Sequence, residues 1–287
     1  MRRDSFPEWP LVFFTLLTQL AVGVFLLWGL AAMLVPAPNP FITGLVPASL
    51  LLVVLLALGS GALAASFHLG RKIGAVFSLS NWRTSWLSRE AISAVGFGLL
   101  ALAAMGLQLT APGFGWIDRL VILLGTVAGI ALVLMISRLY RLRTVPAWDH
   151  WGTPVSFLAT SLMTGAVMLR LIWLLSGRSG YGDLLSAWTV RILGVLILVL
   201  VAVQILVFGI QTLELTHKSG AGAESVRLMW RKFRLVVVSR WLAAGFGAFL
   251  PILGETVLLI LLASLLLLSS EILGRFLFYA AYRREGF

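Results

Sequence analysis

The stretch TGLVPASLLLVVLLALGSGALAASF, from Thr43 to Phe67, decides the fold of this chain. It contains no charged residue, and it exceeds the roughly 20 apolar residues that an α-helix needs to cross a bilayer. Similar runs recur along the whole sequence, which is 60% hydrophobic and has a mean hydropathy of +1.01. A protein of this composition cannot cover its core with a polar surface. The sequence therefore predicts an all-α, polytopic integral membrane protein.

Eight apolar runs are long enough to be membrane-spanning helices. The seventh contains Arg234 and Arg240, and its exit, LPILGET, is a Pro/Gly turn that could also be a kink. Neither an internal repeat nor a long linker divides the sequence, so we expect one membrane domain over residues 1–287. The expected helices lie near residues 10–34, 43–67, 90–109, 117–138, 154–176, 187–212, 233–250 and 253–280.

The basic residues are distributed unevenly between the two sides of the predicted bundle. With eight helices, both termini share one side with the connections that follow the second, fourth and sixth helices. Lys and Arg in short loops favour the cytoplasm, so we expect a protein of the cell inner membrane with both termini cytoplasmic. The net charge of +11 then faces lipid headgroups or a docked protein, and not nucleic acid. The basic residues on this side are Arg2, Arg3, Arg71, Lys72, Arg83, Arg89, Arg138, Arg141, Arg143, Lys218, Arg227, Arg231, Lys232, Arg234, Arg283 and Arg284.

The few metal-ligating residues restrict the redox centres that this protein could hold. The sequence has no cysteine, which excludes a thiolate-bound iron–sulfur cluster or zinc site. The three histidines, His68, His150 and His217, all fall near the predicted cytoplasmic side. A haem within the bilayer would need axial ligands inside helices, so we expect no haem in this chain. Any redox centre that needs thiolates must belong to another subunit.

Five segments, in order from the first helix to the last, carry a likeness to a known family. They are EWPLVFFTLLTQLAVGVFL (Glu8 to Leu26), SFHLG (Ser66 to Gly70), LSREAI (Leu87 to Ile92), RLYRLRTVPAWDHWGTP (Arg138 to Pro154) and SEILGRFLFY (Ser270 to Tyr279). Together they resemble the DmsC family, the membrane anchors of dimethyl sulfoxide reductase-like molybdopterin oxidoreductases. The resemblance implies an eight-helix anchor that holds a four-cluster iron–sulfur subunit and a molybdopterin catalytic subunit. It also implies electron exchange with a quinone, either menaquinone or ubiquinone.

His68 and Glu90 are the leading candidates for a quinone site. They close the second predicted helix and open the third on the same side of the membrane, and an imidazole beside a carboxylate could pass protons. The quinol-binding His and acid of the DmsC family fall on these two positions. The alternative is structural, because a His can interact with a helix end and an acid in a first turn is stabilised by free amides. Arg71 and Arg89, in the same connection, are further quinone-binding candidates.

Two other groups of polar residues could border the quinone. Tyr140 and Arg141 follow the fourth predicted helix and could line the mouth of the site, or belong to an interfacial belt of aromatic and basic residues. Glu271 and Arg275 are spaced i, i+4 in the last helix and share one face. Charges inside a span usually face the bundle interior. Glu271 and Arg275 are thus expected either to line the quinone pocket or to form a structural ion pair.

Three functions are compatible with a polytopic membrane chain of this kind. The resemblance favours an electron-transferring anchor, and a scaffold that binds partners without quinone is an alternative. A secondary transporter fits less well. Transporters often show repeated halves and midplane ionisable residues, whereas this sequence has no repeated halves and its polar groups cluster near one face. In its expected cytoplasmic orientation, this chain most resembles the anchors of sulfite-oxidising complexes that face the cytoplasm. Such an anchor would pass electrons from sulfite to quinone. The alternative is a quinol-oxidising anchor of a reductase for dimethyl sulfoxide or another S- or N-oxide.

Overall fold

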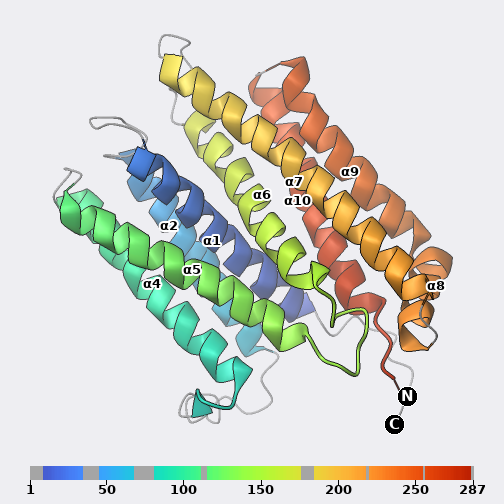
Figure 1. Ribbon diagram of the computed structural model, residues 1–287. Helices are drawn as coiled ribbons and strands as arrows, with labels where there is room; N and C mark the ends of the chain where they lie inside the picture. Colours follow the sequence, from blue (N-terminus) through green and yellow to red (C-terminus); the bar gives the residue numbers. More distant parts are fainter. Residues whose placement is uncertain are drawn as a thin grey trace.

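The computed structural model of the chain is a bundle of long α-helices (Figure 1). It describes residues 9–34, 45–67, 81–110, 115–175, 184–217, 220–254 and 256–285. Within these ranges there are nine helices and no strand, and eight of the helices are long and apolar enough to cross a membrane. The predicted fold class is therefore confirmed. The helices are α1 (Trp9–Leu34), α2 (Leu45–Ser66), α4 (Trp86–Thr110), α5 (Trp116–Tyr140), α6 (Gly152–Leu175), α7 (Leu184–His217), α8 (Ala221–Lys232), α9 (Arg234–Leu253) and α10 (Val257–Ala280).

Several helix ends differ from the sequence prediction. Helix α4 begins at Trp86, four residues earlier than expected, because the Ser85 hydroxyl accepts a hydrogen bond from the Ser88 amide at 3.3 Å and so caps the helix. Helix α7 continues past residue 212 to His217. Helix α9 continues through Pro251 and ends at Leu253, and Thr256 then caps α10. The seventh span thus ends two residues after Pro251, and a separate helix begins at Val257.

Helix α8 is an element that the apolar runs did not reveal. It is 12 residues long, too short to cross a bilayer. Its buried face carries small residues, Ala221, Gly222, Ser225 and Val226, whereas its last turn carries Arg231 and Lys232. The connection between the sixth and seventh spans therefore contains an amphipathic helix, which lies beside the ends of α7 and α9 (Figure 1).

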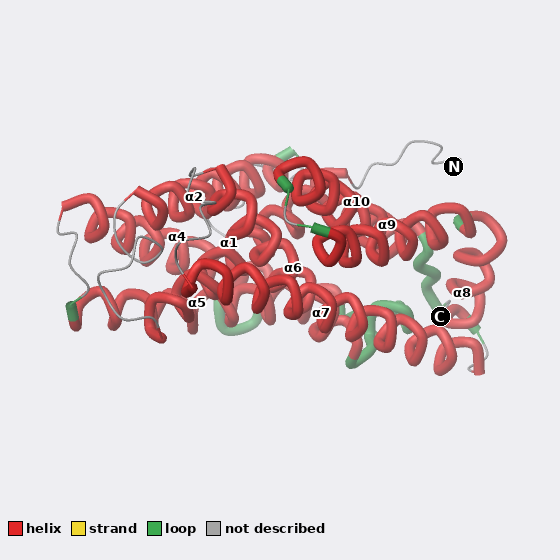
Figure 2. The backbone as a smooth tube through the Cα atoms, turned by 90° about the horizontal axis from the view of Figure 1, so that it is seen from above, coloured by secondary structure: helices red, strands yellow, loops and turns green. Residues whose placement is uncertain are grey.

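Helix α6 lies between two groups of spans. Helices α1, α2, α4 and α5 pack together on one side of it, and α7, α9 and α10 lie on the other (Figures 1 and 2). Helices α1 and α6 approach so closely that a Cβ atom on Gly23 would overlap the Ser161 carbonyl oxygen. This backbone contact holds the first group of helices against α6.

The segments that the sequence assigned to one side of the membrane meet at one end of the bundle. The start of α4, the connection of residues 141–151, helix α8 and the C-terminal residues all lie at this end (Figure 1). We call it the α8 end. The described basic residues that gather there include Arg89, Arg143, Arg231 and Arg283.

Candidate functional site

Glu90 is a buried carboxylate near the α8 end of α4. The residue is 5% exposed, and its Oε2 atom has no hydrogen-bond partner among the residues that the structure describes. Because α4 begins at Trp86, Glu90 lies in the second turn and not in the first. The free amides of the first turn, which were the structural alternative for an acid here, are therefore one turn away. A buried carboxylate oxygen without a partner is costly unless a ligand or water uses it.

Two tyrosines lie close to Glu90. Tyr140 ends α5 and Tyr279 lies near the end of α10, and both interact electrostatically with the Glu90 carboxyl group. Their rings pack edge to face, with centroids 5.4 Å apart. The Tyr279 hydroxyl lies beside Tyr140 and Thr15, but it makes no hydrogen bond of normal geometry within the described residues. Three helices thus bring three groups that can exchange protons into one small region.

The other predicted quinone-site residues do not join Glu90 within the described part of the chain. His68 and Arg71 fall outside the described residues. Arg89 donates hydrogen bonds to the carbonyl oxygens of Trp82 and Arg83, at 2.9 Å and 2.6 Å, and stacks on Trp86. Its guanidinium group therefore holds the turn that precedes α4.

Arg141 is likewise engaged outside the Glu90 region. Its Nε atom lies 3.2 Å from Asp149 Oδ1, within the connection that follows α5. Of the six residues proposed from sequence for quinone binding, the structure brings together Glu90 and Tyr140.

An aromatic cluster separates Glu90 from the second half of the bundle. The cluster consists of Tyr140, Trp148, Phe157, Phe278 and Tyr279, whose rings contact one another with centroids 5.3 to 6.2 Å apart. Its position is fixed by a hydrogen bond of 2.7 Å from Trp148 Nε1 to the Phe278 carbonyl oxygen. Tyr140 and Tyr279 interact electrostatically with Glu90, and the other three residues line a cavity.

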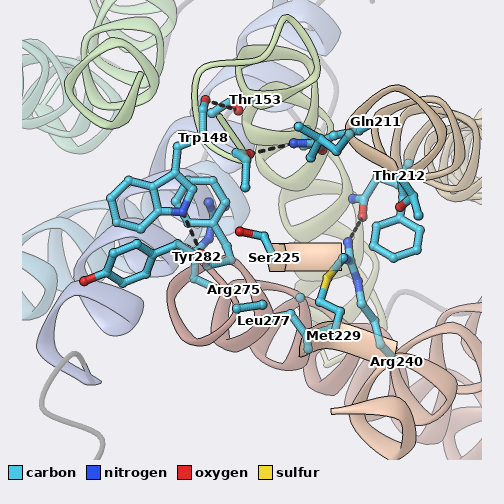
Figure 3. Close-up of a pocket in the computed structure, with 18 of the residues that line it drawn as sticks. Trp148, Thr153, Gln211, Thr212, Ser225, Met229, Arg240, Arg275, Leu277 and Tyr282 are labelled. Atoms are coloured by element: carbon cyan, nitrogen blue, oxygen red, sulfur yellow. Dashed lines mark hydrogen bonds between the residues drawn. The ribbon is translucent and has the colours of Figure 1, made fainter. Parts of the chain in front are cut away.

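The cavity lies among α6, α7, α8, α9 and α10 (Figure 3). Its volume is about 110 Å³, several times the roughly 10–15 Å³ that one water molecule needs. The lining mixes aromatic and aliphatic side chains with polar ones. The polar lining residues from the spans are Thr153, Ser156, Thr160, Gln204, Gln211, Thr212, Arg240, Glu271 and Arg275.

Glu271 and Arg275 both line this cavity, and each has a neutral hydrogen-bond partner. The Thr160 hydroxyl donates to Glu271 Oε2, and Arg275 Nη2 donates to Gln19 Oε1 at 2.7 Å. The two charged groups interact electrostatically, but among the described contacts they form no direct ion pair. The Arg275 guanidinium group lies over the Phe157 ring, 3.9 Å from its centroid. Both residues thus face the bundle interior, as the i, i+4 spacing indicates.

Arg240 joins the same cluster from α9. Its Nη2 atom donates to Gln204 Oε1 at 3.0 Å, and its guanidinium group lies over Trp241. The group reaches α10 because Gly274 has no side chain, and a Cβ atom there would lie 2.7 Å from Arg240 Cζ. Arg240, Gln204 and Thr160 were not proposed as site residues from sequence. The available signal was a charged residue inside the seventh apolar run, because such residues usually face the interior of a bundle.

The described histidines lie at the α8 end and have local roles. His150 Nδ1 accepts a hydrogen bond from the Gly152 amide, and its Nε2 atom lies 3.0 Å from Glu214 Oε2. Nε2 must therefore carry the proton when the ring is neutral. His217 ends α7. Within the described ranges, no three His, Asp or Glu side chains gather as ligands for a metal ion.

Comparison with known proteins places the chain among membrane anchors. Residues 2–281 match the family described as DMSO reductase anchor subunit (DmsC). One of the anaerobic dimethyl sulfoxide reductase chains of Escherichia coli (strain K12) is 30% identical, over 97% of this chain and 96% of its own length. Another from the same organism, YnfH, is 29% identical, over 99% and 98%. One sulfite dehydrogenase subunit of Allochromatium vinosum is 36% identical, but over only 37% of this chain and 35% of its own length. The eight-span bundle and the match along its length show that this chain belongs to the DmsC family of membrane anchor subunits.

Proposed function

We propose that this chain exchanges electrons between an iron–sulfur subunit and the quinone pool, with the quinone headgroup bound beside Glu90. The observation that carries the proposal is the buried Glu90 Oε2 atom, which lacks a partner among the described residues and lies near Tyr140 and Tyr279. Interconversion of quinone and quinol moves two electrons and two protons, so a site for it needs groups that hydrogen-bond the ring oxygens and move protons. Glu90 can donate to a carbonyl oxygen when protonated and accept from a hydroxyl when ionised. His68 is proposed as the second proton-passing group, and Arg71 as a further contact.

The partner subunits of this chain are proposed from its membership of the DmsC family. We expect a four-cluster iron–sulfur subunit and a molybdopterin catalytic subunit to bind this chain, because it has no cysteine with which to hold a cluster. The full-length similarity to dimethyl sulfoxide reductase chains supports a quinol-oxidising anchor of an S- or N-oxide reductase. The similarity to a sulfite dehydrogenase subunit over part of the sequence, together with the expected cytoplasmic orientation, supports sulfite oxidation with quinone reduction.

Purification of the tagged protein from its native membrane tests the proposal. An electron-transferring anchor is expected to copurify with an iron–sulfur subunit and a molybdenum subunit, and the complex is expected to show quinone-dependent turnover. A scaffold would copurify with the same partners but would leave turnover independent of quinone. A transporter would be recovered alone. Either of the last two results would contradict the proposed function.

We further propose that the α8 end faces the cytoplasm of the inner membrane. Arg143, Arg231 and Arg283 lie there, and basic residues in short loops favour the cytoplasmic side. Alkaline phosphatase fused after Phe287 is expected to be inactive, because the enzyme folds only after export to the oxidising periplasm. The same fusion in the opposite connection, near Gly180, is the matched control and should be active. An active fusion at Phe287 would place the α8 end in the periplasm.

A further inference from the structure

We propose that the cavity among α6, α7, α8, α9 and α10 holds water, and that Glu271 passes protons through it between the quinone site and the aqueous phase at the α8 end. The inference rests on the proposed function, because it adds a proton route to the quinone site at Glu90. Oxidation of one quinol releases two electrons and two protons, and reduction of one quinone takes up the same number. The electrons exchange with the iron–sulfur subunit, so the protons need a path of their own through this protein.

The cavity walls supply hydrogen-bonding atoms that the protein itself leaves unused. Four buried atoms of residues that line the cavity lack hydrogen-bond partners among the described residues: Gln204 Nε2, Arg240 Nε, Arg275 Nε and Glu271 Oε1. Leaving buried polar atoms without a hydrogen-bond partner destabilises the folded protein. Three of these atoms donate and one accepts, and water can meet both requirements in a space of about 110 Å³. Water is therefore the occupant that fits the walls.

The cavity extends to the α8 end of the bundle. Ser225, Val226 and Met229 of α8 line it, together with Trp148 of the connection before α6 and Thr153 in the first turn of α6 (Figure 3). Because these segments form the end of the bundle, the cavity joins Glu271, inside a span, to the region where α8 meets the solvent or headgroup layer. A proton on Glu271 can thus leave without crossing the apolar middle of the membrane.

The hydrogen-bond partners of Glu271 suit a proton carrier better than the counter-ion of an arginine. Its nearest partner is the neutral Thr160 hydroxyl, which donates to Oε2, and Oε1 has no partner in the described part of the structure. Arg240 and Arg275 are instead held by the side-chain oxygens of Gln204 and Gln19. Both arginines still interact electrostatically with Glu271, which lowers the cost of a carboxylate inside the membrane.

Arg275 and the two tyrosines connect the cavity with Glu90. The Arg275 guanidinium group interacts electrostatically with Glu271 and also with Tyr140 and Tyr279. The same tyrosines interact with Glu90. The Tyr279 hydroxyl, which has no partner of normal geometry in the described part of the sequence, is the group that can exchange a proton toward either side. The order of the route is therefore Glu90, the tyrosine pair, Glu271 and the cavity.

Replacement of Glu271 tests the route in the intact complex. Glu271→Gln keeps the shape and the Thr160 hydrogen bond but removes the titrating group. We expect a fall of about tenfold in quinone-linked kcat, less than for a group in contact with the reacting oxygens, with the KM for quinone unchanged. Turnover with a viologen dye that exchanges electrons directly with the iron–sulfur subunit should remain at the wild-type level. The matched control is Glu224→Gln, an exposed acid on α8, which should leave both activities unchanged.

The outcomes separate this inference from the proposed function. A Glu271→Gln complex with normal quinone-linked turnover, together with a Glu90→Gln complex that has lost it, overturns only the proton route. A raised KM for quinone at normal kcat would also overturn it, because the cavity would then bind quinone itself. Normal turnover in both variants would contradict the quinone site at Glu90.

Cysteine substitution tests the presence of water independently of activity. The sequence has no native cysteine, and alkylation by iodoacetamide needs a thiolate, which forms in water and not in an apolar interior. Thr160 and Thr164 lie one turn apart on α6 and are both 3% exposed, but only Thr160 lines the cavity. We expect Thr160→Cys in the native complex to be alkylated at least about tenfold faster than Thr164→Cys. Equal rates, or no reaction at Thr160→Cys before denaturation, would show that the cavity is dry and would overturn the inference.

Discussion

Replacing Glu90 by Gln is expected to lower quinone-linked turnover of the assembled complex by about 100-fold or more, the usual effect of removing a general acid or base. Gln has nearly the same size, so the packing of α4 against its neighbours should not change. What the substitution removes is the only carboxylate that the structure places beside Tyr140 and Tyr279 within the described residues. The measurement is steady-state turnover with a soluble quinone or quinol analogue.

Two comparisons make the Glu90 result specific. Viologen-linked turnover of the same preparation should equal that of the wild-type complex, because that assay bypasses the membrane subunit. The Glu224→Gln variant, with its acid exposed on α8, should keep full quinone-linked turnover. Wild-type quinone turnover in an assembled Glu90→Gln complex would remove Glu90 from the quinone site.

The spans could be predicted from sequence because the bilayer imposes a simple length on them. Each apolar run had to be long enough to cross the hydrocarbon layer, and all eight appear as helices. The helix ends were harder to predict, because caps depend on single side chains. The start of α4 is set by the Ser85 hydroxyl, which apolar patterning does not detect. Helix α8 was missed because its buried face consists of small residues such as Ala221 and Gly222 and gives no apolar run.

The candidate site could be predicted only where its residues are close together in the sequence. Glu271 and Arg275 share a face of one helix, as their i, i+4 spacing predicts. Their hydrogen-bond partners come from other helices, with Thr160 lying 111 positions from Glu271 and Gln204 lying 36 positions from Arg240. Such pairs depend on which helices are neighbours and on their rotation, and one sequence does not fix either. The cavity therefore became visible only in the folded bundle.

The close contact between α1 and α6 is expected to control the stability of the bundle. At Gly23 the two backbones touch, since a Cβ atom there would overlap the Ser161 carbonyl oxygen and lie 3.2 Å from Gly165 Cα. Gly165 faces Gly23 in return, and its own Cβ atom would overlap the Gly23 carbonyl group. Small residues at such positions allow membrane helices to approach closely. Neither backbone can move aside as a flexible side chain would.

Gly23→Ala is therefore expected to destabilise the bundle by more than the roughly 1–3 kcal/mol typical of overpacking. Helix α1 must separate from α6, and this disturbs Thr15 beside Tyr279 and Gln19 beneath Arg275, both of which come from α1. The yield of monodisperse protein in detergent and the midpoint of its thermal unfolding should both fall sharply. Gly96→Ala, in the middle of α4, is the matched control, because a Cβ atom there meets nothing within 4 Å. It should keep the wild-type midpoint, since Ala is at least as favourable as Gly inside a helix. Equal midpoints for the Gly23→Ala and Gly96→Ala proteins would show that α1 and α6 are not in backbone contact.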